Sequence, residues 1–153
     1  MKKTLYLPIE IKFRELFPKL LIAFFAAKKD FFSILGDKES VDRATRYFGE
    51  GIYFDKSISM NKFSKFKNLG KRNIKVICQD EEGGFNKVKK KHIENFFKNR
   101  VTEKNLNIIE QFFCWGKFDY KELRKKHLKN KKKLFLTGSA RIDFWNNKFI
   151  SKI

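Results

Sequence analysis

The sequence contains no long hydrophobic run. Its longest uninterrupted apolar stretch, LLIAFFAA at residues 20–27, is much shorter than the roughly 20 residues that a membrane-spanning helix requires. A signal peptide needs an unbroken apolar core after its basic start. Here charged side chains interrupt that region at Glu10, Lys12, Arg14, Glu15 and Lys19. We therefore expect a cytoplasmic chain with neither a membrane anchor nor a removed leader.

Cysteine and histidine are also scarce, with two residues of each. Cys78 and Cys114 stand inside apolar, strand-like runs, so we expect two small core residues in a reducing compartment rather than a disulfide. There is no CxxC pair, and neither His92 nor His127 has companions at the spacing of a metal site. The sequence thus predicts no metal site and no cofactor.

Acidic residues are few, since 36 Lys and Arg face 17 Asp and Glu, a net charge of +19. The excess is uneven: residues 1–60 carry 11 basic and 8 acidic side chains, and residues 61–153 carry 25 and 9. Much of it lies in the clusters KVKKKHIENFFKNR and KELRKKHLKNKKK. Such clusters indicate either a polyanion partner or a solvated helix face. The chain shows no nucleic-acid-binding module, which disfavours a nucleic-acid partner.

Short apolar runs alternate with amphipathic stretches along the chain. The runs predict strands at residues 5–9, 31–35, 51–54, 74–78, 112–115 and 133–137. Their nearly continuous apolar character is typical of strands covered on both faces. The alternation predicts one α/β domain over residues 1–153: a Rossmann-like three-layer sandwich with a mostly parallel sheet of about six strands.

The stretches between the strands predict helices. Pro18 suits the first turn of a helix that runs to about Lys29. Its core-facing stripe is predicted to be Phe17, Leu20, Leu21, Phe24 and Phe25. Further helices are expected with Ser40 as N-cap, with Asn61 as N-cap and Gly70 as stop, with an Asp119–Glu122 capping box and an end near Asn130, and within part of residues 87–107.

Polar residues follow almost every predicted strand. Because parallel strands end at the same edge of a sheet, these residues should lie close together, where ligands bind in open α/β sheets. They are Glu10, Lys12, Arg14 and Glu15 after the first strand; Asp55, Lys56 and Ser57 after the third; Asp80, Glu81, Glu82 and Gly83 after the fourth; Trp115 in the fifth; and Gly138, Ser139 and Arg141 after the sixth.

The DEEGG segment, with three consecutive carboxylates, is the loop that most clearly suggests catalysis. Carboxylates held close together raise one another's pKa, which prepares one of them for acid or base catalysis. Gly83 permits a tight turn or a close backbone approach to a ligand. The alternative is a solvated acidic turn.

The cations and the last loop suit an anionic ligand. Lys12, Arg14, Lys56 and Arg141 can bind a phosphate or carboxylate, or they can form ion pairs with neighbouring acids. The TGSAR segment can offer backbone N–H groups to an anion, but it is neither a P-loop nor a GxGxxG motif. Trp115 suits the core as well as a stacking platform.

Five motifs, taken in order, resemble a known family. They are LYLPIEIKFRE…KLLIAFFAA, GIYFDKSIS, DEEGG, FFCWG and LTGSARID, and they cover the chain from Leu5 to about Trp145. This set resembles the N-terminal half of the bacterial surface carbohydrate biosynthesis proteins. Those proteins are similar to GT-B glycosyltransferases, UDP-N-acetylglucosamine 2-epimerases and polymer glycerophosphotransferases.

The resemblance implies a GT-B-like N-terminal domain that faces a second Rossmann-like domain across a cleft. In that architecture the second domain binds most of the nucleotide-sugar donor, while the first contacts the acceptor and often supplies the catalytic base. By resemblance, Glu10, Glu81 and Glu82 are the candidates for the base. The chain stops soon after the sixth strand, so we expect a truncated or split form without the donor-binding domain.

Two functional hypotheses follow. The first is the acceptor-side domain of a transferase in surface polysaccharide biosynthesis, with a nucleotide sugar, a glycan acceptor and a separate C-terminal half as partners. The second is a non-catalytic module whose basic surface over residues 86–133 holds an anionic glycan, a membrane surface or nucleic acid.

Overall fold

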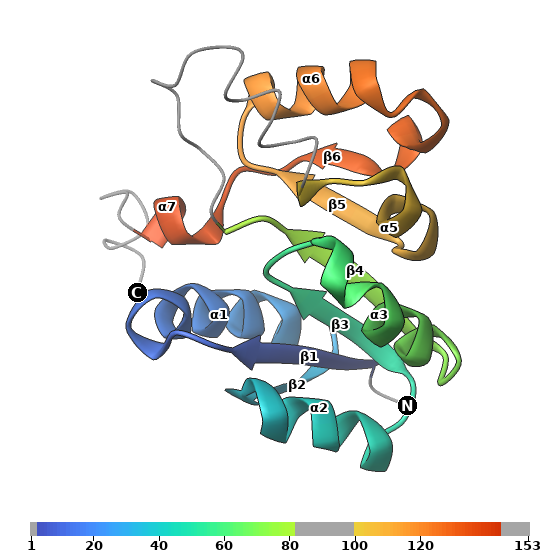
Figure 1. The fold of residues 1–153 in the computed structure, drawn as a ribbon. Helices are drawn as coiled ribbons and strands as arrows, with labels where there is room; N and C mark the ends of the chain where they lie inside the picture. The colour runs from blue at the N-terminus through green and yellow to red at the C-terminus, as the bar shows by residue number, and fades with distance from the viewer. Residues whose placement is uncertain (1–2, 82–99, 145–153) are drawn as a thin grey trace.

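The computed structural model describes residues 3–81 and 100–144, and these form an α/β fold (Figure 1). Six parallel strands make one sheet in the order β2-β1-β3-β4-β5-β6. The strands are β1 (Lys3–Ile9), β2 (Phe31–Asp37), β3 (Gly51–Asp55), β4 (Ile74–Gln79), β5 (Gln111–Cys114) and β6 (Leu134–Leu136). The predicted fold class and all six predicted strands are confirmed.

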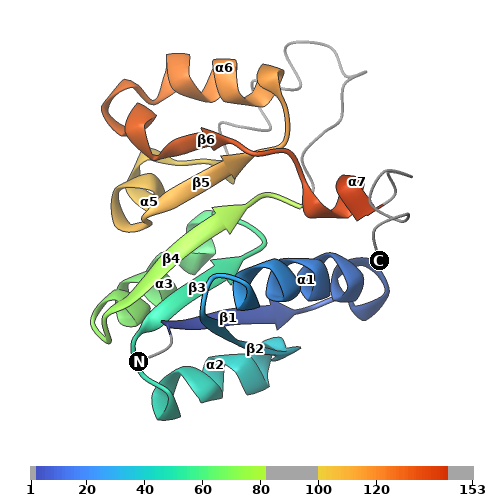
Figure 2. The same cartoon turned by 180° about the vertical axis from the view of Figure 1, so that it is seen from behind.

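Helices cover both faces of the sheet, which gives three layers (Figures 1 and 2). They are α1 (Lys12–Ala27), α2 (Lys38–Tyr47), α3 (Phe63–Gly70), α5 (Glu103–Ile108), α6 (Lys117–Lys126) and α7 (Ala140–Phe144), with two short 3₁₀ turns, η1 (Met60–Lys62) and η2 (Leu128–Lys133). The chain moves from β1 to β2 in one direction across the sheet and from β2 onward in the other. Right-handed crossovers therefore place α1 on the face opposite α2, α3, α5 and α6.

The larger core lies on the face covered by α2, α3, α5 and α6. Strand side chains such as Tyr6, Tyr53 and Phe112 are buried there against Phe66 of α3 and Leu123 of α6. Both cysteines are free and buried in this core, as the sequence predicts. None of the helices in the described part of the chain is long and apolar enough to cross a bilayer.

The opposite face carries a smaller core. Leu5, Leu7 and Phe54 are buried there, with Ile22 and Ala26 of α1 packed against them. A largely apolar groove of about 460 Å³ lies beside α1 and reaches α7. The described helices therefore cover this face less completely than the other.

Helix α1 departs from its prediction in where it begins. It starts at Lys12, so Pro18 lies inside the helix and not in its first turn. The side chain of Glu15 accepts hydrogen bonds from the backbone N–H groups of Glu10 and Ile11. Those bonds satisfy donors ahead of the first turn, so the helix can begin well before the proline.

Helix α1 also departs from its prediction in which side faces the core. Phe17, Leu20, Phe24 and Phe25 are between 44% and 56% exposed, so the predicted core-facing stripe is wrong for these four residues. Ile22, Ala23 and Ala26 face the sheet instead. Glu15, which is bonded to the loop after β1, and Lys19, which is bonded to Pro8 within β1, fix the rotation of the helix about its axis.

Three of the predicted caps differ in the structure. Asp37 caps α2 by accepting from the N–H of Ser40, which was itself the predicted cap. Asn61 lies within η1, and α6 follows Gly116 without a side-chain cap and ends at Lys126. The stop of α3 at Gly70 is confirmed. Part of residues 87–107 is helical, as α5, and residues 82–99 lie outside the described part of the chain.

Candidate functional site

The candidate site lies at the carboxyl edge of the sheet, between β1 and β3. Strand β1 pairs with β2 on one side and β3 on the other, so the chain leaves β1 and β3 in opposite directions. Such a switch point is where open parallel sheets bind ligands. Glu10 follows β1 here, Asp55 ends β3, and Lys56 and Ser57 come next. The sequence prediction of a shared edge is thus met by the topology.

Glu15 is the anchor of this edge, and its side chain is fully buried. Its carboxylate accepts from the N–H of Glu10 at 2.9 Å and from the N–H of Ile11 at 3.3 Å. Arg14 Nη2 lies 3.3 Å from the same carboxylate. Burial alone would raise the pKa of Glu15, but the Glu10 N–H and the charges of Lys19 and Lys56 hold it below its ordinary value.

The position of the Glu15 carboxylate has a consequence for anions. The start of the first helix of a doubly wound sheet is a common phosphate site, because its N–H groups point outward. In this chain the Glu15 carboxylate accepts the N–H groups of Glu10 and Ile11, which lie just ahead of that turn. A phosphate at this helix start would therefore lie close to the buried negative charge of Glu15.

Two lysines neutralise the buried carboxylate. Lys19 is 2% exposed; its Nζ donates to the carbonyl of Pro8 and lies 3.8 Å from Glu15 Oε2. Burial lowers the pKa of Lys19 despite the nearby carboxylates. Lys56 Nζ lies 3.5 Å from Glu15 Oε1 and contacts Glu10 Oε2. That hydrogen bond lowers the pKa of Glu10.

Asp55, the last residue of β3, is the buried carboxylate on the β3 side of this edge. Its buried carboxylate accepts from Lys62 Nζ and from the N–H of Ser57, the latter at 3.2 Å. Lys65 Nζ lies 3.9 Å from the other oxygen and donates to the hydroxyl of Tyr53 at 2.6 Å. The orientation of Asp55 is therefore fixed from three sides, by η1, α3 and its own loop.

Glu81 differs from the other carboxylates of the edge. Its N–H donates to the carbonyl of Lys56 at 3.0 Å, which joins the loop after β4 to the loop after β3. Burial raises the pKa of Glu81, and the charge of Glu15 adds to the effect. Lys19, Arg14 and Lys56 oppose the shift without cancelling it. Glu81 thus combines partial burial, a raised pKa and a place beside the switch point.

The remaining predicted residues divide into four groups. Asp80 is buried and accepts two hydrogen bonds from Arg100, at 2.7 and 2.9 Å. Gln79 Nε2 donates to the carbonyl of Gly138 at 2.6 Å, and the carbonyl of Ser139 accepts in the first turn of α7. Lys12 and Arg141 make no described contact with Glu15 or with the residues bonded to it. Glu82 and Gly83 lie outside the described residues.

Sequence reasoning missed Lys19, Lys38 and Lys62, which line or neutralise this edge. A lysine inside an apolar helix, four residues after a glutamate, was a signal for a buried pair at Lys19. The crevice between these groups has a volume of about 10 Å³, because ion pairs fill it.

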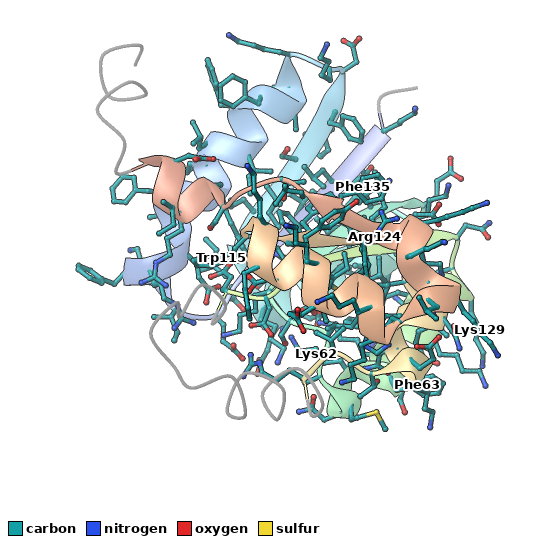
Figure 3. All side chains as sticks on the ribbon, turned by 90° about the horizontal axis from the view of Figure 1, so that it is seen from above. Lys62, Phe63, Trp115, Arg124, Lys129 and Phe135 are labelled. Atoms are coloured by element: carbon teal, nitrogen blue, oxygen red, sulfur yellow. The ribbon has the colours of Figure 1, made fainter. Side chains whose placement is uncertain are left out.

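Trp115 follows β5 at the same edge and is half-buried, and Figure 3 labels it. Its indole Nε1 is buried and has no hydrogen-bond partner among the described residues. Nor does the described part of the chain hold a group of three His, Cys, Asp or Glu side chains placed to bind a metal ion. Comparison of the chain with protein-family models, curated proteins and solved structures gives no match.

Proposed function

We propose that this chain is the acceptor-side domain of a GT-B-like transferase of bacterial surface polysaccharide biosynthesis. The family resemblance of its motifs supports this function, and the all-parallel sheet agrees with the expected architecture. The observation that carries the proposal is Glu81, a carboxyl with a raised pKa beside the switch point of the sheet. A base for an acceptor hydroxyl needs such a carboxyl, with a pKa moved toward neutral pH.

The proposed reaction transfers a sugar from a nucleoside diphosphate to a glycan hydroxyl. The Glu81 carboxylate takes the hydroxyl proton while the hydroxyl oxygen forms a bond to the anomeric carbon. The bond from that carbon to the phosphate oxygen breaks, and the nucleoside diphosphate leaves with the electron pair. A second domain or chain would hold the donor.

The other charged groups of the edge suit supporting roles. The pKa of Glu10 is lowered by Lys56, so Glu10 is better suited to accept hydrogen bonds from acceptor hydroxyls than to accept a proton. Lys56 itself lies between Glu10 and Glu15 and can contact an anionic substituent of the glycan. Glu15 holds the β1–α1 loop through the N–H of Glu10, and Lys19 holds the end of β1 through the carbonyl of Pro8.

The experiment is a titration of the ¹⁵N-labelled full chain, followed by backbone amide shifts. The ligands are nucleoside diphosphate sugars and neutral and acidic oligosaccharides, each at low and moderate salt. We expect shifts at Glu10, at residues 55–57 and at residues 80–81. Glu81→Gln should lower the affinity for the bound ligand at least about fivefold, since the charged acceptor of a hydrogen bond from the ligand is lost.

The matched control is Glu110→Gln. Glu110 is exposed and comes just before β5, at the other edge of the sheet, where it pairs with Lys75 at 3.9 Å. This variant should leave binding unchanged. Shifts that lie away from the carboxyl edge, or an equal effect of both variants, would overturn the proposal.

A second candidate is a non-catalytic module that binds a polyanion. Lysines stand exposed along α6 and η2, and Figure 3 labels Arg124 and Lys129 on this surface. They are Lys117, Lys121, Lys125, Lys126, Lys129, Lys131 and Lys132. Binding through this surface should weaken steeply with salt and should survive Glu81→Gln. The same titration therefore separates the two candidates.

A further inference from the structure

The outer side of α1 is an exposed apolar surface. Phe13, Phe17, Leu20 and Phe24 follow one another along it at intervals of four, three and four residues, so they share one side of the helix. Phe13 is 99% exposed, and the other three are about half exposed. We name these four residues the α1 outer face. An amphipathic helix usually turns its apolar side chains inward and its charges outward, whereas here Glu15 and Lys19 are buried and these apolar side chains are exposed.

The exposed charges within residues 12–29 are all basic, and the exposed acids Glu10 and Asp30 lie just outside this range. Lys12 is exposed at the first turn of the helix, and Lys28 and Lys29 are exposed just after its last turn. Lys28 Nζ lies 4.5 Å from the ring centroid of Phe24. Glu15, the sole acid of residues 12–29, is buried. A ligand that fits this surface would therefore be apolar, with negative charge opposite Lys12, Lys28 and Lys29.

The shape of the α1 outer face and the net charge of the chain favour one kind of partner over the others. The α1 outer face is the convex side of a helix, and its flanks, at Leu16, Leu21 and Ala27, are apolar too. A partner helix of a coiled coil would need charged flanks to set its register. A second copy would bring a net charge of +19 against an equal charge. A flat anionic surface with an apolar interior meets neither difficulty.

We propose that the α1 outer face docks on the surface of an anionic lipid bilayer. The phenylalanines would lie at the boundary of headgroups and acyl chains, and Lys12, Lys28 and Lys29 would contact lipid phosphates. Apolar insertion and basic residues act together in such contacts, since each alone holds a protein weakly. This docking is independent of the proposed transferase activity.

The test is flotation of the full chain with vesicles, either of equal phosphatidylglycerol and phosphatidylcholine or of phosphatidylcholine alone. We expect retention on the anionic vesicles. Phe13→Ser/Phe24→Ser should lower the partition coefficient at least about tenfold, because two aromatic side chains no longer leave water. Phe13→Ser alone should lower it by a smaller factor, and at 99% exposure that change leaves the fold intact.

The matched control is Tyr47→Ser/Phe48→Ser. These two aromatics are exposed, at 84% and 55%, and lie at the end of α2 on the other face of the sheet. The control should keep full retention. Lys28→Gln/Lys29→Gln should weaken retention on the anionic vesicles.

Four outcomes would overturn the proposal. They are the absence of retention on either vesicle type, an equal loss with the control variant, retention that depends on Lys125 and Lys129 but not on Phe13, and self-association through Phe13 and Phe24 in sedimentation velocity. The third outcome would assign the contact to the α6 surface. The fourth would make a second copy the occupant of this face.

Discussion

Glu15 and Lys19 lie one turn apart on the inner side of α1, both buried, with 3.8 Å between Glu15 Oε2 and Lys19 Nζ. The carboxylate also holds the N–H groups of the loop after β1, and the amine holds the carbonyl of Pro8. This pair thus joins the rotation of the helix to the geometry of the candidate site. Taking both charges out of water is unfavourable, so each depends on the other and on its hydrogen bonds for compensation.

Removing one member of this pair should be costly. We expect Glu15→Leu to lower the free energy of unfolding by about 3–5 kcal/mol, because Lys19 is then buried without its partner. The double variant Glu15→Leu/Lys19→Met should be more stable than Glu15→Leu alone, since no charge is left to desolvate. Urea denaturation measures both. Glu110→Ala, which breaks a surface pair, should change stability by less than about 1 kcal/mol.

Glu81 should make the chain less stable as pH rises. A carboxyl whose pKa is higher in the folded than in the unfolded chain binds its proton more tightly when folded. The stability that the protonated Glu81 contributes is therefore lost as pH rises from the ordinary pKa of 4.5 through the raised value. We expect Glu81→Gln to have a higher thermal midpoint than the wild type at about pH 7 and an equal one below about pH 4. A lower midpoint at neutral pH would contradict this sign.

Arg100 should stabilise the end of β4 through Asp80. Two hydrogen bonds join their side chains, at 2.7 and 2.9 Å, and Asp80 is buried. We expect Arg100→Met to lower the free energy of unfolding by about 2 kcal/mol, because a buried carboxylate loses a charged, two-pronged donor. Arg46→Met serves as the control, since Arg46 is exposed on α2. Equal stability of the two variants in urea would argue against a role for the pair.

Gly51 should tolerate no side chain. An added Cβ would lie 2.5 Å from the carbonyl oxygen of Thr4 and 3.0 Å from the ring of Tyr6. We expect Gly51→Ala to cost about 1–3 kcal/mol, because β1 and β3 would have to move apart. At Gly70 nothing lies within 4 Å of an added Cβ. Gly70→Ala should therefore be neutral or slightly stabilising in the same denaturation measurement.

The strands and their common edge could be predicted from the sequence. Short, largely apolar runs such as LYLPI and IKVIC are typical of strands covered on both sides, and each lies in the sheet where it was expected. The shared location of the charged residues after β1, β3 and β4 could be predicted from the same alternation of strands and helices. In a parallel sheet the order of the chain alone brings such loops to one edge.

Side chains that act on one another across the fold could not be predicted in this way. The stripe around Leu20 and Phe24 has the spacing of a core-facing helix, and the structure turns it outward. Asp37, not Ser40, caps α2, although both are common N-cap residues near the same helix start. Local pattern ranks such choices only weakly when two residues can serve the same purpose.

The sequence by itself determined the alternation of strands and helices, and with it the three layers and the polar edge. Only the tertiary structure decided how α1 is rotated and which carboxylate has the raised pKa. The reason is physical: apolar periodicity is a property of neighbours along the chain, whereas the bonds of Glu15 to the β1 loop and the burial of Glu81 depend on residues that meet only after folding.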